Sequence, residues 1–202
     1  MYKISRILSS VFSPILLPTY AMIVTGQVTV MHLLPQATLW IVTGVVFLLT
    51  AVMPAVSIVS LYRLGMVSGP ELNERTERTI PYLTVTASYL VCGYFMQRSG
   101  APGWLSMFFY GGALASLVST VVNRWWKISA HAAAMGGATA MLFVILLSHQ
   151  NVVSLDWWIT GTILAAGAVM TARVYMQRHT LMQVLAGCAN GFLCVLLPGL
   201  WF

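Results

Sequence analysis

The chain has 202 residues, of which 59% are hydrophobic and only 7% are charged, and its mean hydropathy is +0.85. A soluble domain carries about 25% charged residues, so this composition excludes an ordinary soluble protein and predicts an integral membrane protein. The formal net charge of +6 then belongs to loops beside a membrane, and nucleic acid is not an expected partner. The three cysteines lie inside apolar runs without a Cys-x-x-Cys pair, so we expect neither a metal site nor a disulfide.

Long apolar runs separated by short polar segments predict an all-α fold, a polytopic transmembrane helix bundle with six to seven spans. The first apolar run follows Lys3 and Arg6, as in a signal peptide, but it is long enough to span and has no small-residue cleavage site. We therefore expect a single integral membrane domain over residues 1–202. The expected spans are 14–34, 37–62, 80–97, 103–122, 130–148, 157–175 and 181–201.

Three polar segments stand out in this apolar chain: 73–81 (NERTERTIP), 127–131 (KISAH) and 171–183 (TARVYMQRHTLMQ). Two crossings separate each segment from the next, so all three emerge on the same membrane face. Nine of the ten basic residues fall on that face, and only Arg98 lies opposite. Every tryptophan lies near a predicted span end, as expected for side chains that gather at membrane interfaces. A joint site is therefore topologically possible.

Small residues indicate where helices approach each other closely. The stretch AAAMGGATA after His131 and the pair Gly187-x3-Gly191 are expected helix-packing surfaces. Asn190 in the last span is expected to bond a neighbouring helix. These features predict architecture and no chemistry.

The residues of the three polar segments suit phosphate-ester chemistry. Arginine and lysine in a partly desolvated cleft bind phosphate, arginine in bidentate fashion. Ser129 and the free N–H groups that begin the fifth span add hydrogen bonds, as helix N-termini do for anions. Of two histidines beside a phosphorus atom, one attacks as nucleophile and the other protonates the leaving oxygen. A phosphate ester held at a membrane surface points to a lipid.

The pattern resembles the type 2 phosphatidic acid phosphatase (PAP2) superfamily, the lipid phosphate phosphatases. The family's third motif, Ser-Arg-x5-His-x3-Asp, corresponds to 172–183 (ARVYMQRHTLMQ), and its second, Pro-Ser-Gly-His, corresponds to 128–131 (ISAH). Its first motif, Lys-x6-Arg-Pro, is only echoed within 75–81. The resemblance covers about residues 71–191, the expected catalytic core. The stretches FSPILLPTYA and KISAHAAAMGG also look like a bacterial branch of these phosphatases.

The resemblance implies a metal-independent phosphatase that hydrolyses a phosphomonoester or diphosphate of a lipid, in a bacterial inner membrane. His179 is then the nucleophile that forms a phosphohistidine, and His131 is the general acid. No metal or cofactor is implied, because cationic side chains neutralise the developing charge. The implied partners are a lipid phosphate substrate and membrane lipids. The implied phosphate-binding residues are Arg173, Ser129, Lys127, Arg78 and Arg75.

The sequence departs from the family's pattern in two places. The strict first motif would place its lysine at Asn73 and its arginine at Ile80. Gln183 stands where the family has an aspartate that orients the nucleophilic histidine. Glutamine accepts the same ring N–H hydrogen bond but lacks the charge, and losing a comparable aspartate in a serine-protease triad costs about 10⁴ in rate. Asp156 lies on the opposite face, so we hypothesise that a first-motif glutamate substitutes: Glu71, Glu74 or Glu77.

Other readings are left open. The basic residues also fit interfacial anchors under the positive-inside rule. A non-catalytic lipid-phosphate-binding homologue would use the same cations but tolerate loss of His179. A small membrane transporter needs polar groups near mid-span and usually an inverted repeat, whereas the polar groups here cluster at one interface. The charge count places the motif face in the cytoplasm, whereas many relatives have periplasmic sites. The lipid and the oligomeric state are also open.

Overall fold

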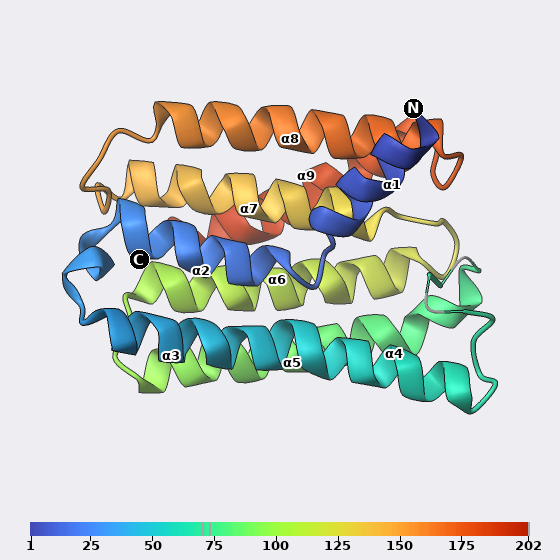
Figure 1. Cartoon of the computed structure of the whole chain (residues 1–202), viewed down its shortest axis with the longest axis horizontal. Coiled ribbons are helices and arrows are strands. Elements are labelled where there is room, and N and C mark those ends of the chain that lie inside the picture. The colour runs from blue at the N-terminus through green and yellow to red at the C-terminus, as the bar shows by residue number, and fades with distance from the viewer. Residues whose placement is uncertain (70, 73, 202) are drawn as a thin grey trace.

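The computed structural model describes residues 1–69, 71–72 and 74–201, and over these residues its regular secondary structure is helical (Figure 1). The long helices run side by side along the longest axis of the molecule. This arrangement confirms the all-α prediction. In chain order, the α-helices are α1 (Tyr2–Val11), α2 (Leu17–Val28), α3 (Gln36–Phe47), α4 (Met53–Arg63), α5 (Thr79–Arg98), α6 (Gly103–Val122), α7 (Ala130–Leu147), α8 (Asp156–Tyr175) and α9 (Leu181–Gly199).

Four helices within the described residues are long and apolar enough to cross a membrane: the continuous helix Gln36–Arg63, α6, α7 and α9. They indicate a multi-pass integral membrane protein, as the composition predicted. Helices α5 and α8 have 20 residues each but are less apolar and are not among the four. At 1.5 Å per residue they are about 30 Å long, which matches the hydrocarbon thickness of a bilayer.

The N-terminal region differs from the single span expected over 14–34. Helix α2 has only 12 residues, with Pro18 in its first turn and the extended residue Thr29 at its end. Thr29 also forms an isolated antiparallel bridge with Asn151, which turns the chain away from the helix axis. A 12-residue helix extends about 18 Å, too short to cross a membrane alone.

Helix α1 was not expected from the sequence. It packs against α8, and its buried residues are Ser5 and Ser9. Ile4 and Ile7 are exposed on its surface. A helix with polar residues turned inward and apolar residues turned outward suits a lipid environment, and its inner face borders the site described below.

The second expected span, 37–62, is one continuous helix from Gln36 to Arg63 that contains a π-turn at Leu48–Val52. Pro54 follows this turn and explains it. Proline has no N–H group, and its ring clashes with the carbonyl four residues earlier. The wider π-turn relieves that clash.

Glycines bring α7 and α9 into close contact, as the small-residue stretches predicted. A β-carbon on Gly187 would lie 2.5 Å from the carbonyl oxygen of Ser129, and one on Gly191 would overlap the carbonyl of Ala133. Asn190 bonds α6 as expected, because its Nδ2 donates to the Ala115 carbonyl oxygen at 2.9 Å. Close packing therefore fixes the start of α7 beside the start of α9.

The connections α4–α5, α6–α7 and α8–α9 lie together at one end of the bundle, together with the N-terminus (Figure 1, right). The described residues of the three polar segments therefore lie at the same end of the bundle, as the count of crossings predicted. Most of the tryptophans expected in the interfacial belts are exposed, whereas Trp104 is buried in the core.

Candidate active site

Contacts between the three polar segments bring them together. The Arg78 guanidinium donates through Nη1 to the Ile128 carbonyl oxygen at 3.5 Å. The ring of His179 contacts the Lys127 carbonyl oxygen at 3.2 Å. An ion pair of 2.6 Å joins Arg178 to Glu71. Segments some fifty and a hundred residues apart in the chain therefore form one region.

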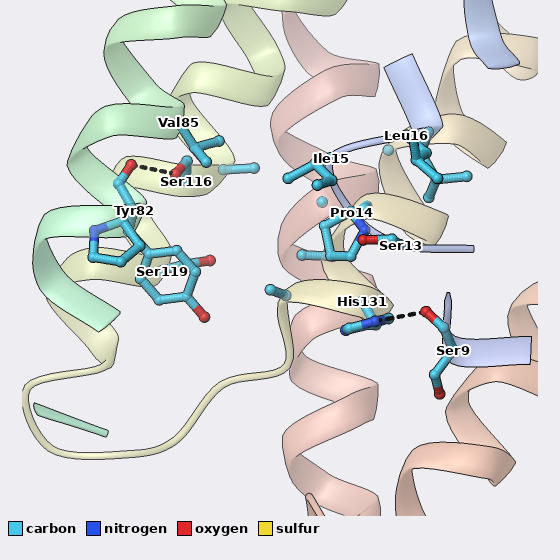
Figure 2. A pocket seen from close by; sticks show the side chains of 18 of the residues that line it. Ser9, Ser13, Pro14, Ile15, Leu16, Tyr82, Val85, Ser116, Ser119 and His131 are labelled. Atoms are coloured by element: carbon cyan, nitrogen blue, oxygen red, sulfur yellow. Dashed lines mark hydrogen bonds between the residues drawn. The ribbon is translucent and has the colours of Figure 1, made fainter. Parts of the chain in front are cut away.

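A cavity of about 640 Å³ extends from this region into the bundle. Figure 2 shows one wall with Tyr82, Val85 and the serines of α6, and the opposite wall with His131, Ser9 and the α1–α2 connection. Four of the eight residues predicted for the site line this cavity: His131, His179, Arg173 and Arg78.

His179 is buried, and its Nδ1 has two oxygen neighbours. These are the Lys127 carbonyl oxygen and Gln183 Oε1, both at 3.2 Å. Gln183 Oε1 also accepts the Thr180 N–H at 3.1 Å, within the capping box that begins α9. Carbonyl oxygens only accept hydrogen bonds, so Nδ1 carries the proton. The neutral ring therefore keeps its lone pair on Nε2, the nitrogen that a nucleophile uses.

The surroundings of His179 keep this ring neutral. Burial, together with the positive charges of Arg78 and Arg173, lowers the pKa of His179 to about 4, although the bonds to Gln183 and Lys127 oppose the shift. A neutral imidazole is a nucleophile, whereas an imidazolium is not. The site therefore presents a reactive nitrogen at neutral pH.

His131 begins α7 and has a different partner. Its Nε2 lies 3.0 Å from the backbone carbonyl oxygen of Ser9 (Figure 2). Because that oxygen accepts, Nε2 is the protonated nitrogen of the neutral ring and Nδ1 holds the lone pair. A general-acid role for His131 would therefore require either an imidazolium with a proton on Nδ1 or an opened Ser9 contact that frees the Nε2 proton.

Four arginines line the cavity, Arg6, Arg78, Arg173 and Arg178, and two of them were predicted for the site. Arg78 donates through Nε to the Leu72 carbonyl oxygen at 2.9 Å, so part of its guanidinium serves to hold the loop. The Nε of Arg173 is buried without a hydrogen-bond partner. A buried charged donor without a partner destabilises the empty protein, and an anion in the cavity would satisfy it.

The other three predicted phosphate-binding residues, Lys127, Ser129 and Arg75, are not part of the cavity lining. Burial lowers the pKa of Lys127, and Arg78 adds to the effect, so this lysine lies near the cations of the site. Ser129 is fully buried and caps α7, where its Oγ accepts the Ala132 N–H at 3.4 Å. Arg75 donates to the Arg124 carbonyl oxygen. Asn73, the strict first-motif lysine position, lies outside the described residues.

Two of the three first-motif glutamates, Glu71 and Glu77, have other partners. Glu71 lines the cavity but pairs with Arg178, and Glu77 accepts the Ser68 N–H at 2.6 Å. The two partners described for the His179 ring are neutral oxygens. Substitution by a glutamate therefore stays a hypothesis. Asp156 bonds Ser154 at the start of α8, at the far end of the bundle.

Sequence reasoning gave no role in the site to several polar residues that line the cavity, among them Arg6, Ser9 and Tyr82. Ser9 acts through its backbone carbonyl, for which no side-chain pattern exists. Tyr82 directly follows segment 75–81, which resembles the first motif, and this position in the sequence is the only feature that could have indicated a role in the site. Within the described residues, no group of three or more His, Cys, Asp or Glu side chains is placed to hold a metal ion.

Comparison with curated proteins and with solved structures finds no match. A family model described as PAP2 superfamily matches residues 122–201. The match begins later than the expected core of 71–191, so it leaves out the first-motif region, and it extends to the end of α9. It contains His131, Arg173 and His179 with the helices that carry them, and it assigns residues 122–201 of this chain to a PAP2 superfamily domain.

Proposed function

We propose that the protein is a membrane-embedded lipid phosphate phosphatase that works through a phosphohistidine on His179. One observation carries the proposal: the unpartnered Nε of Arg173 shares a cavity with a buried, neutral His179 whose Nε2 is free. The site combines an anion-binding group with a nucleophile, and the PAP2 match covers both residues.

The reaction has two steps. The Nε2 lone pair of His179 attacks phosphorus, the bond from phosphorus to the lipid oxygen breaks, and His131 gives a proton to that oxygen. A water molecule then attacks phosphorus, the P–N bond breaks, and inorganic phosphate leaves. His131 takes the water's proton in this second step, because the general acid of one half-reaction is the base of the next. Arg173 and Arg78 stabilise the charge on the phosphoryl oxygens.

The far part of the cavity supports a lipid substrate. Beyond the polar residues its lining is apolar, and Figure 2 shows Ile15 and Leu16 opposite Val85. An acyl or prenyl chain would fill this part while the phosphate stays with the arginines. Both mono- and diphosphates of lipids fit this arrangement, and we propose that class without naming one lipid.

We extend the proposal to topology and family branch. Helices α5 and α8 run beside α6 and α7 (Figure 1), so they cross the bilayer with them and raise the number of spans to six, or seven when α1 and α2 together count as one. The catalytic core runs from about 71 to 191, because Arg78 belongs to the cavity. Gln183 makes this a variant site in a bacterial inner-membrane protein, where a neutral amide orients His179.

A second candidate is a lipid-phosphate-binding protein without turnover. Two contacts favour it. The Ser9 carbonyl occupies Nε2 of His131, and Gln183 gives His179 no negative charge. Such a protein would bind the same lipids through Arg173 and Arg78.

A turnover assay separates the two candidates. Purified protein in detergent is given a panel of lipid phosphates with a metal chelator, beside His179→Ala and the control His32→Ala, whose side chain lies exposed at the far end of the bundle. The phosphatase proposal expects phosphate release that His179→Ala abolishes and His32→Ala leaves unchanged. Binding without release by the wild-type protein would favour the second candidate.

A further inference from the structure

Buried polar atoms without partners gather around the cavity. Nine such side-chain atoms occur among the described residues. Three belong to residues that line the cavity: Ser9 Oγ, Tyr82 Oη and Arg173 Nε. An unsatisfied buried polar group destabilises a protein, and a native structure that keeps one calls for an explanation. Three around one cavity indicate a ligand that offers several oxygen atoms.

Tyr82 lies in the first turn of α5, directly after Pro81, and only 9% of its surface is exposed. Figure 2 shows it on the wall that faces His131. The neighbouring hydroxyls on that wall already have partners. Ser116 donates to the Tyr82 carbonyl oxygen at 2.9 Å, and Ser119 Oγ accepts from Asn190 at 3.1 Å. The O–H hydrogen of Tyr82, by contrast, has no acceptor, while Arg78 lies beside its oxygen as a donor.

The charges around Tyr82 indicate what it binds. The positive charges of Arg78 and Arg173 both act on its hydroxyl. A guanidinium has hydrogen-bond donors and no acceptor, so beside it the phenol oxygen is oriented as an acceptor. The O–H hydrogen then remains available for a negatively charged oxygen, the same ligand that the two arginines attract.

We propose that Tyr82 is a substrate-binding residue that donates its hydroxyl hydrogen bond to a phosphoryl oxygen held by Arg78 and Arg173. The proposal rests on the proposed function, and it adds a residue that lies outside all three motifs and outside the matched segment 122–201. It also means that the region around the first motif contributes two phosphate-binding groups, Arg78 and the Tyr82 hydroxyl. Ile80 stands at the strict arginine position, and a neutral donor two residues later supplements the single cavity cation of this loop.

The test uses Tyr82→Phe, which removes one oxygen atom and keeps the ring. Tyr94→Phe is the matched control, because Tyr94 lies on the same helix with its ring exposed and under the Arg98 guanidinium, a contact that phenylalanine preserves. Two quantities are measured for each protein in detergent. They are the thermal midpoint without ligand, and the affinity for inorganic phosphate from the rise of that midpoint with phosphate concentration.

Tyr82→Phe is expected to weaken phosphate binding roughly tenfold or more, because hydrogen bonds to charged groups are among the strongest. Its midpoint without phosphate should be unchanged or higher, since an unsatisfied buried hydroxyl has been removed. Tyr94→Phe should change neither quantity. A lower midpoint with unchanged phosphate affinity would overturn the proposal, because it would mark the hydroxyl as structural.

The same experiment separates this inference from the proposed function. Phosphate affinity does not require turnover, so a wild-type protein that binds phosphate without hydrolysing lipid phosphates would refute the phosphatase and still decide the role of Tyr82. A third outcome is turnover that depends on His179 together with equal phosphate affinity in Tyr82→Phe and the wild type. This outcome would support the phosphatase and overturn the role of Tyr82. Absence of phosphate binding in the wild type would overturn the proposed role of Tyr82, and the turnover assay would still decide the phosphatase.

Discussion

Helices α7 to α9 and the helices that precede them contribute different groups to the same cavity. The C-terminal part, which matches the PAP2 family, supplies both histidines and Arg173, whose Nε has no hydrogen-bond partner. The N-terminal part supplies the opposite wall, with Tyr82 and Arg78, and the Ser9 carbonyl that holds His131. In the proposed reaction the two histidines make and break bonds and Arg173 stabilises the charge that develops, whereas the second set binds the substrate.

The two regions also differ in how they are held. Helices α7 and α9 touch through glycines that admit no β-carbon, so the positions of His131 and His179 are fixed by backbone contacts. On the N-terminal side, α5 and α6 are long helices, whereas α1 and α2 are short and are joined through residues 12–16 beside His131. Catalytic groups need a fixed geometry, whereas a wall that admits a lipid chain has to open. The predictions below test this division.

The largest effect is expected from Arg173→Ala in the C-terminal part. It removes a charged donor that stabilises the transition state, and single donors of this kind are worth about 10²–10³ in kcat. We expect kcat/KM to fall by about 10³, mainly through kcat. The control is Arg124→Ala, an exposed cation at the same end of the bundle. Equal losses in the two variants would show that only the overall positive charge matters.

The next largest effect is expected from Arg78→Ala in the N-terminal part. If this wall binds substrate, KM should rise by roughly 10²-fold while kcat falls less. Arg75→Ala serves as the control, because Arg75 donates to the Arg124 carbonyl outside the cavity lining. A loss in kcat as large as that of Arg173→Ala would contradict the division between the two regions.

Helix packing gives a smaller but specific effect. Gly187→Ala places a β-carbon 2.5 Å from the Ser129 carbonyl oxygen, whereas a β-carbon on Gly167 in α8 meets nothing within 4 Å. Overpacking of this kind costs about 1–3 kcal/mol. Thermal unfolding in detergent should show a midpoint several degrees lower for Gly187→Ala and little change for Gly167→Ala. Equal midpoints would refute the rigid contact.

The pH dependence gives the smallest effect. Because the pKa of His179 is lowered to about 4, the neutral nucleophile persists as the pH falls and is lost only near pH 4. Gln183→Asp adds a negative charge beside the ring, which raises that pKa, so the acidic fall of kcat/KM should move to higher pH. The phosphate group of the substrate titrates in the same way in assays of the wild type and of Gln183→Asp. The difference between their pH profiles of kcat/KM therefore reports the protonation of His179. Coincident acidic limbs would contradict this.

The long helices on both sides of the cavity were predictable from the sequence, whereas the contacts that Ser9 and Tyr82 make in the cavity were not. The spans 103–122 and 130–148 agree with α6 and α7 within one residue, because long apolar runs with tight turns leave few alternatives. Pairing of the motif residues followed from counting crossings. Ser9 binds through its backbone and Tyr82 lies in an ordinary apolar context, so neither carries a pattern. The expected first span 14–34 is cut short because α2 ends at Val28 and Thr29 bridges Asn151, a tertiary contact that no local pattern shows.

Trapping the covalent intermediate tests the central claim most directly. Labelled lipid phosphate is mixed with excess protein, quenched with base within the first turnover, and the protein is digested and mapped by mass spectrometry. Nδ1 of His179 is hydrogen-bonded to the Lys127 carbonyl and to Gln183, so phosphate should be found on Nε2 of His179, as an acid-labile adduct. The His131→Ala variant should still form this adduct when the substrate has an activated leaving group, which needs no general acid. An adduct on Nδ1, an adduct on another residue, or turnover without any covalent intermediate would contradict the account.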